Sequence, residues 1–219
     1  MSTLRIKICG ITQANQGVAI AQAGASILGF IAVPASPRYI PPTDLRPLAA
    51  TLMRETPETQ RWGVFANASL EAIATFQAAG QLTGIQLHGD ETLDDCRRVR
   101  DRLPNVELIK AIRVKDQTSL DRALEYATVV DILLLDAYRP GVLGGTGATL
   151  DWDTLTAFDP GCPWFLAGGL RPDNIQQALG HITPAGIDLS SGVERSPGNK
   201  DLNKITDLFQ TLRQMGAIQ

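Results

Sequence analysis

The amino-acid sequence predicts an α/β fold, a single-domain, parallel, eight-stranded (β/α)8 barrel over residues 1–219. Eight short apolar runs have the length of strands, and amphipathic segments of helical period separate them. The starts of successive runs are roughly 22 to 34 residues apart, about one β–α unit each. No linker rich in Pro and Ser interrupts the alternation, so a closed barrel is favoured over separate domains.

The expected strands are mostly continuous apolar runs, which is typical of parallel strands covered on both faces. They span residues 5–10, 27–32, 61–66, 84–88, 107–113, 130–136, 164–168 and 186–190. The alternative is an open doubly wound sheet, which usually has fewer strands and a glycine-rich first turn. Because the first strand ends in CGIT and lacks a G-x-G-x-x-G pattern, the barrel is the preferred interpretation.

Four intervening segments show a helical pattern. Residues 70–80 place apolar side chains three to four positions apart, and we expect this helix to stop at Gly80. Residues 90–103 begin acidic and end basic, as the helix dipole prefers. Residues 119–127 and 201–215 repeat the amphipathic pattern.

Composition narrows the class of protein. Apolar residues make up 44% and charged residues 20% of the chain, and the net charge of −3 gives no general attraction to nucleic acid or to an anionic membrane. We therefore expect neither as a partner. The three cysteines are widely spaced without a CxxC pair, which indicates free thiols and a cytoplasmic location. A monomer is slightly favoured over an oligomer.

In a barrel of this kind the active site forms at the C-terminal ends of the strands. The polar residues and glycines expected at that rim are Cys9, Arg38, Asn67, His88, Arg113, Asp136, Gly168, Gly169, Asp188, Ser190, Ser191 and Gly192. A thiol, carboxylates, cations and glycine-containing loops thus meet on one rim. The two histidines, His88 and His181, are not spaced as a pair of metal ligands, so no metal site is expected.

Three glycine-containing turns, at residues 141–147, 166–170 and 188–194, predict a phosphate site. Glycine lets backbone N–H groups approach an anion closely, and serine hydroxyls add donors. The alternative is a set of tight turns that need positive φ. In (β/α)8 enzymes a phosphate commonly lies between the loops after strands 7 and 8, beside a short extra helix for which residues 192–201 leave room. The candidate phosphate-binding residues are Gly145, Gly147, Gly168, Gly169, Ser190, Ser191 and Gly192.

Four residues can carry chemistry or recognition. A lone strand cysteine is usually structural, but Cys9 lies at a strand end beside a glycine turn and Lys7. Asp136 ends the strongest apolar run, where an unpaired carboxylate is costly; it either caps the following loop or serves as a general acid. Arg38 follows two prolines that stiffen its loop, which suits bidentate binding of a carboxylate. His88 is either an acid/base group or a structural residue.

Seven segments carry a family resemblance and follow one another in this order: KICGIT, SPRYI, GIQLHGDE, IKAIRV, LLLDAYRPGVLGGTGATLDW, LAGGLRPDNI and GIDLSSGVERSPGNKD. With them the chain resembles the phosphoribosylanthranilate isomerases from residue 5 to about 210. The resemblance implies an enzyme of tryptophan biosynthesis that converts N-(5-phosphoribosyl)anthranilate to 1-(2-carboxyphenylamino)-1-deoxyribulose 5-phosphate by an Amadori rearrangement, without metal or organic cofactor.

The resemblance also implies residue roles. Cys9 corresponds to the general base, Asp136 to the general acid, and Arg38 to the residue that binds the anthranilate carboxylate of the sugar-phosphate substrate. Asp188 corresponds to a position beside the substrate, and we place His88 near the substrate as well. The chain departs from the family after GGTG, where Ala148 replaces a frequent lysine.

Three other functions compete. Indole-glycerol-phosphate synthase needs an N-terminal extension and catalytic lysine and glutamate residues at strand ends, whereas the first strand here begins by residue 5. A metal-dependent ribulose-phosphate epimerase needs more histidines at the rim than His88. A non-catalytic sugar-phosphate sensor would bind product without turnover and would tolerate Cys9→Ser.

Overall fold

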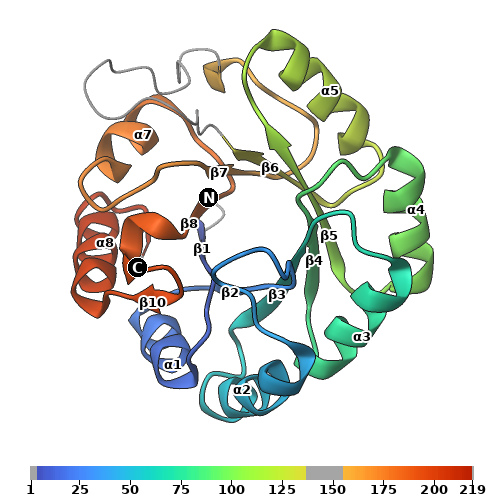
Figure 1. Ribbon diagram of the computed structural model, residues 1–219. Coiled ribbons are helices and arrows are strands. Elements are labelled where there is room, and N and C mark those ends of the chain that lie inside the picture. The colour runs from blue at the N-terminus through green and yellow to red at the C-terminus, as the bar shows by residue number, and fades with distance from the viewer. Residues whose placement is uncertain (1–3, 137–154, 219) are drawn as a thin grey trace.

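Eight parallel strands close into a barrel in the computed structural model, which describes residues 4–136 and 155–218 (Figure 1). The strands are β1 (Arg5–Cys9), β2 (Ile27–Ile31), β3 (Gln60–Phe65), β4 (Gly84–Leu87), β5 (Glu107–Arg113), β6 (Ile132–Asp136), β7 (Trp164–Ala167) and β8 (Gly186–Leu189). Each strand pairs with the next one in the chain, and β8 closes the ring on β1. The predicted (β/α)8 barrel is confirmed, with strand ends that differ from expectation by at most two residues.

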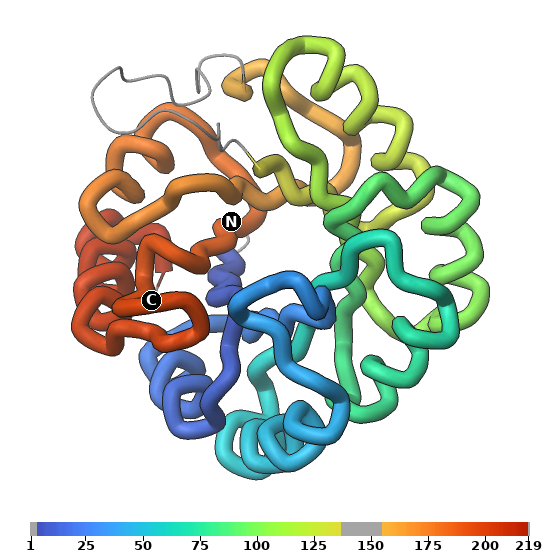
Figure 2. The backbone as a smooth tube through the Cα atoms, viewed as in Figure 1, coloured from blue at the N-terminus to red at the C-terminus, as the bar shows by residue number. Residues whose placement is uncertain are grey.

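Helices surround the barrel, as the tube in Figure 2 also shows. They are α1 (Ala14–Ala23), α2 (Pro42–Glu55), α3 (Leu70–Gly80), α4 (Leu93–Arg102), α5 (Gln117–Ala127), α7 (Ile175–His181) and α8 (Leu202–Gln214). Helix α4 begins where Thr92 and Asp95 form a capping box. Helix α3 ends at Gly80 as expected, but the left-handed residue that stops it is Gln81, with φ of 44°. None of the helices in the described ranges is long and apolar enough to cross a membrane.

Two apolar layers explain why the strands are apolar on both faces. Outward-facing side chains such as Ile8 and Phe30 belong to a large cluster that packs the strands against the helices. A smaller cluster inside the barrel contains Trp62 and Phe165, whose rings stack with centroids 5.6 Å apart. The Arg5 guanidinium lies 5.2 Å from the Trp62 ring and donates to Glu107, which closes the N-terminal end of the barrel.

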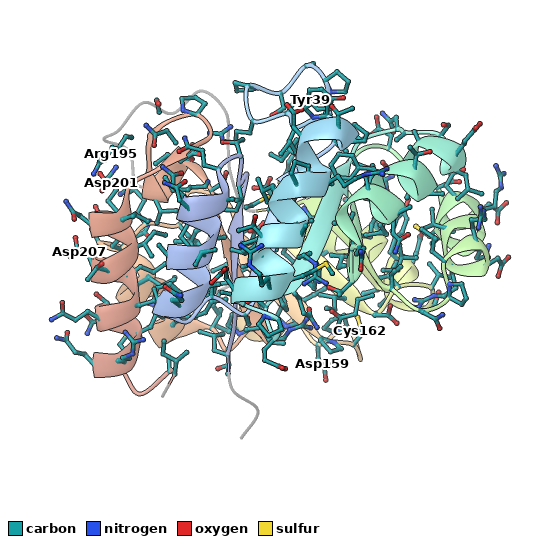
Figure 3. The ribbon with its side chains drawn as sticks, turned by 90° about the horizontal axis from the view of Figure 1, so that it is seen from below. Tyr39, Asp159, Cys162, Arg195, Asp201 and Asp207 are labelled. Atoms are coloured by element: carbon teal, nitrogen blue, oxygen red, sulfur yellow. The ribbon has the colours of Figure 1, made fainter. Side chains whose placement is uncertain are left out.

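The two ends of the barrel differ in what they present. Figure 3 shows Tyr39 and Arg195 at one end, in segments that follow strand ends, and Cys162 at the other end. After β8 the chain forms a 3₁₀ turn, η1 (Ser191–Val193), and a hairpin of β9 (Glu194–Ser196) and β10 (Asn199–Lys200) before α8 begins. This insertion covers part of the rim where the functional residues were expected.

Candidate active site

The Cys9 thiol lies at the end of β1 beside a buried ion pair. Lys7, two residues earlier on the same strand, is fully buried and its Nζ lies 3.0 Å from Asp188 Oδ1. Lys7 and Asp188 stand directly opposite each other where β8 closes on β1. Gly29 of β2 is opposite Cys9, and a β-carbon there would lie 2.9 Å from Cys9 Sγ and 3.1 Å from Lys7 Nζ. The thiol and the ammonium therefore converge on the space that this glycine leaves.

Burial and charge act in opposite directions on these groups. Burial raises the pKa of the Cys9 thiol above its ordinary value, and the nearby ammonium of Lys7 reduces that rise. Burial acts to lower the pKa of Lys7, but Asp188 and Cys9 together outweigh it and the pKa lies above its usual value. Lys7 is accordingly a cation at neutral pH, whereas Cys9 without a substrate is a neutral thiol.

Asp136 and His88 form a second polar group on the same rim. Asp136 is the last residue of β6, and His88 directly follows β4. His88 Nε2 lies 3.5 Å from Asp136 Oδ2, and each side chain is about a quarter exposed. Behind His88, the buried side chain of Gln86 places its Nε2 3.0 Å from His88 Nδ1.

One cavity of about 290 Å³ joins these groups. Its wall includes Cys9, Gln86, His88, Asp136, Gly168, Gly169, Asp188, Ser190, Ser191 and Gly192. The sequence positions of these residues are far apart, and they meet because each lies in the C-terminal half of a parallel strand of one barrel or shortly after it. The volume of the cavity and the polar side chains in its wall fit a small polar ligand.

Arg38 lies beside this cavity and is held by charge. Its aliphatic stem packs over Gly10, where a β-carbon would come within 2.6 Å of Arg38 Cδ. The guanidinium donates from Nε and from Nη2 to the Glu194 carboxylate, at 2.9 Å and 2.7 Å. These hydrogen bonds raise the pKa of Arg38. Glu194 also accepts from the buried ammonium of Lys200 at 2.8 Å.

Lys200 connects the ion pair of Arg38 and Glu194 to the end of β1, which carries the Cys9 thiol. Its ammonium donates to the carbonyl oxygens of Cys9 and Ser190, and burial lowers its pKa. Burial acts to raise the pKa of Glu194, but the hydrogen bonds from Arg38 and Lys200 outweigh it and the pKa lies below its usual range. The Glu194 carboxylate therefore ties the loop after β2 to the end of β1.

The loops after β7 and β8 have the geometry of an anion site. Gly168 and Gly169 both have positive φ, 95° and 66°, which glycine adopts readily. Ser191 and Gly192 open the turn η1, where helical geometry provides no acceptor for the first N–H groups. A β-carbon at Gly192 would lie 2.0 Å from the Leu170 carbonyl oxygen, so the two loops touch. The candidates Gly145 and Gly147, like Ala148, lie outside the described residues.

Comparison with known proteins identifies the family. A family model described as N-(5'phosphoribosyl)anthranilate (PRA) isomerase matches residues 6–211. The N-(5'-phosphoribosyl)anthranilate isomerase of Synechococcus elongatus is 57% identical over 99% of this chain and 99% of its own. The chain belongs to the phosphoribosylanthranilate isomerase family. It is an isomerase of tryptophan biosynthesis, as the resemblance of its motifs implied.

Solved structures agree with this assignment to the phosphoribosylanthranilate isomerases. The enzyme from Thermotoga maritima is 35% identical and superposes with a TM-score of 0.86, covering 96% of this chain and 99% of that one. A second phosphoribosylanthranilate isomerase, 34% identical with a TM-score of 0.84 over 96% of this chain and 99% of that one, was solved with reduced 1-(o-carboxyphenylamino)-1-deoxyribulose 5-phosphate.

Sequence reasoning missed three polar residues of this isomerase site. Gln86 is buried inside the barrel, and its alternation with outward-facing apolar neighbours was the available signal; Lys7, which the sequence placed beside Cys9, is buried there as well. Glu194 and Lys200 are charged residues in the segment after β8, which the sequence marked only as room for a turn. Within residues 4–136 and 155–218, no group of three or more His, Cys, Asp or Glu side chains is arranged to hold a metal ion.

Proposed function

We propose that Cys9 is the general base and Asp136 the general acid in the rearrangement of N-(5'-phosphoribosyl)anthranilate. One observation carries the proposal: both residues line the cavity that also contains the glycine and serine loops after β7 and β8. A thiol and a carboxyl group are both able to move protons at carbon and oxygen. Each step requires only proton transfer, so we propose no cofactor.

The order of the strands in the barrel supports one orientation of the substrate in the cavity. Strands β7 and β8 stand between β6, which ends in Asp136, and β1, which ends in Cys9. A phosphate bound by Gly168, Gly169, Ser191 and Gly192 would extend its ribose toward the centre of the barrel. The ribose carbons would then lie between the acid and the base, and the phosphate contacts would fix their orientation.

The reaction proceeds in two proton-transfer stages. Asp136 in its protonated form donates its proton to the furanose ring oxygen; the C1′–O bond breaks, and the anilino nitrogen lone pair forms a C1′=N iminium. Cys9 as a thiolate then removes the C2′ proton, and the C–H electrons form the C1′=C2′ bond of an enolamine while the nitrogen recovers its lone pair. Tautomerisation to the ketone completes the rearrangement.

The positive charge of the ring-opened substrate would favour the thiolate form of Cys9. Burial favours the neutral thiol of Cys9, and Lys7 alone does not overcome that preference. The iminium of the ring-opened substrate would place a second cation near the thiol, which favours the thiolate at the stage where it is needed. In this order Asp136 would give up its proton at ring opening, before Cys9 loses its own proton to solvent and acts as the base.

Arg38 is proposed to bind the anthranilate carboxylate. Glu194 uses Nε and Nη2 of the guanidinium, and no described residue accepts from Nη1. Two N–H groups of Nη1 are therefore available to a carboxylate, while Glu194 holds the plane of the guanidinium in place. We also infer a cytoplasmic location, which suits a biosynthetic enzyme whose three cysteines are free thiols.

Turnover of freshly generated substrate by wild type, Cys9→Ser and Asp136→Asn tests the proposal. Each variant should lose on the order of 10²-fold or more in kcat, the contribution of a positioned acid or base. Cys162→Ser is the matched control, because this thiol lies at the opposite end of the barrel (Figure 3) and should leave kcat unchanged. Retention of wild-type turnover by Cys9→Ser would refute the assignment of the base.

A further inference from the structure

Gln86 combines deep burial with an unsatisfied polar atom in the wall of the active site. The side chain comes from β4, is 1% exposed and lines the same cavity as Cys9 and Asp136. Its Oε1 is the one buried side-chain oxygen or nitrogen without a hydrogen-bond partner in the described ranges 4–136 and 155–218. A buried carbonyl without a donor is unfavourable, so its position against a ligand cavity needs a functional explanation.

The other end of the same amide faces His88. Gln86 Nε2 lies 3.0 Å from His88 Nδ1, and an amide nitrogen donates but does not accept. His88 Nδ1 must therefore be the acceptor, and the proton of the neutral ring lies on Nε2. That Nε2–H faces Asp136 Oδ2 at 3.5 Å. A row of polar groups thus runs from Gln86 through His88 to Asp136.

We propose that Gln86 is a positioning residue that uses both ends of its amide. Its NH₂ group holds His88 as the Nε2–H tautomer, and its carbonyl oxygen accepts a hydrogen bond from a hydroxyl of the bound sugar phosphate. This inference rests on the proposed function, because it places the ribose beside Asp136.

The tautomer matters for the acid. A proton on Nδ1 would point at the Gln86 NH₂ group, so the amide disfavours the Nδ1–H tautomer. In the other tautomer Nε2–H lies on the side of Asp136 Oδ2, 3.5 Å from Nε2, and is able to donate to a carboxyl group in either of its forms. The charged residues that share a cavity wall with His88 are Asp90, Lys110, Arg113, Lys115, Arg122, Asp136 and Asp188.

A contact between the Gln86 carbonyl and the substrate explains why Oε1 has no partner within the protein. The substrate class carries several ribose hydroxyls, each an O–H donor of the kind Oε1 lacks. A hydroxyl at this place would satisfy Gln86 only when substrate is bound, which adds to binding and orients the ribose against Asp136. If the amide were turned over, its NH₂ group would face the cavity and Oε1 would accept from Nδ1–H. The experiment below separates the two orientations.

Imidazole ¹⁵N spectroscopy reads the tautomer directly, because the chain has only two histidines. A His181→Gln variant assigns the signals, and spectra recorded at increasing pH until the ring signals no longer change report the neutral rings. Wild type should show His88 as the Nε2–H tautomer, and Gln86→Met should shift the ring toward a mixture. Wild-type His88 as the Nδ1–H tautomer, or a Gln86→Met spectrum identical to wild type, would overturn the proposal.

Ligand binding tests the carbonyl. Reduced 1-(o-carboxyphenylamino)-1-deoxyribulose 5-phosphate should bind Gln86→Met roughly 2- to 10-fold more weakly than wild type, the effect of one neutral hydrogen bond. Gln77→Met is the control, because Gln77 of α3 donates to the Leu82 carbonyl away from the cavity; its spectrum and binding should match wild type. Unchanged binding by Gln86→Met would refute the sugar contact. The spectroscopic result does not depend on turnover, so it can fail or hold independently of the roles of Cys9 and Asp136.

Discussion

Replacing Gly29 with alanine should displace the Cys9 thiol without substituting any of the reactive residues. Gly29 is opposite Cys9 in the β1–β2 register. A β-carbon at position 29 would lie 2.9 Å from Cys9 Sγ, 3.1 Å from Cys9 Cα and 3.1 Å from Lys7 Nζ. Favourable non-bonded contact between heavy atoms needs about 3.5 to 4.0 Å, so the thiol would have to move by roughly 0.6 to 1.1 Å.

A displacement of that size at a reacting group costs on the order of 10²-fold in rate. We therefore expect Gly29→Ala to lower kcat by about that factor, and to lower the free energy of unfolding by about 1 to 3 kcal/mol because the site is overpacked. Turnover assays and urea denaturation measure the two effects separately.

Gly180→Ala is the matched control. Gly180 lies in α7, and a β-carbon there would meet no atom within 4 Å. This variant should keep wild-type kcat. It should raise the free energy of unfolding by at most about 1 kcal/mol, because alanine is favoured over glycine within a helix. A folded Gly29→Ala protein with wild-type kcat would refute the claim that the Cys9 thiol must occupy this position.

Two further predictions follow from the charged groups. Glu194→Gln leaves the buried ammonium of Lys200 without a carboxylate, and should lower the free energy of unfolding at pH 7 by about 3 to 5 kcal/mol in urea denaturation. Arg38 and Lys200 hold the pKa of Glu194 below its ordinary value of 4.5, so the ionised Glu194 stabilises the fold above pH 4.5 and this stabilisation is lost as the pH falls through the lowered pKa. The Glu194→Gln variant should not show this loss of stability. A variant whose stability falls with acid as steeply as that of wild type would contradict the reasoning. Burial raises the pKa of Cys9, so its alkylation by iodoacetamide should be slow at pH 7 and should accelerate above pH 9. Peptide mass spectrometry measures the rate. Rapid alkylation of Cys9 at pH 7 would contradict the neutral thiol.

Much of the fold was predictable because buried parallel strands leave a strong local signal. The eight apolar runs, each followed by an amphipathic segment, identify the strands to within two residues. Once the strands are placed, the rule that barrel sites form at their C-terminal ends brings Cys9, His88, Asp136 and Asp188 together, and all four line one cavity.

The rest of the site depends on contacts that no local pattern encodes. Lys7 and Asp188 are 181 positions apart, and their ion pair exists only because β8 closes on β1 in one register. Arg38 was expected to owe its position to stiffening prolines, whereas the structure adds Glu194, 156 positions away. Gln86 reads as one polar residue in an apolar strand until the barrel places it behind His88.

A crystal structure with reduced 1-(o-carboxyphenylamino)-1-deoxyribulose 5-phosphate would test the central claim most directly. We expect the phosphate between Gly168-Gly169 and Ser191-Gly192, C2 of the sugar within about 3 to 3.5 Å of Cys9 Sγ, and the C4 hydroxyl within hydrogen-bond reach of Asp136. A phosphate bound elsewhere on the rim, or a sugar whose C2 lies beyond the reach of Cys9, would contradict it.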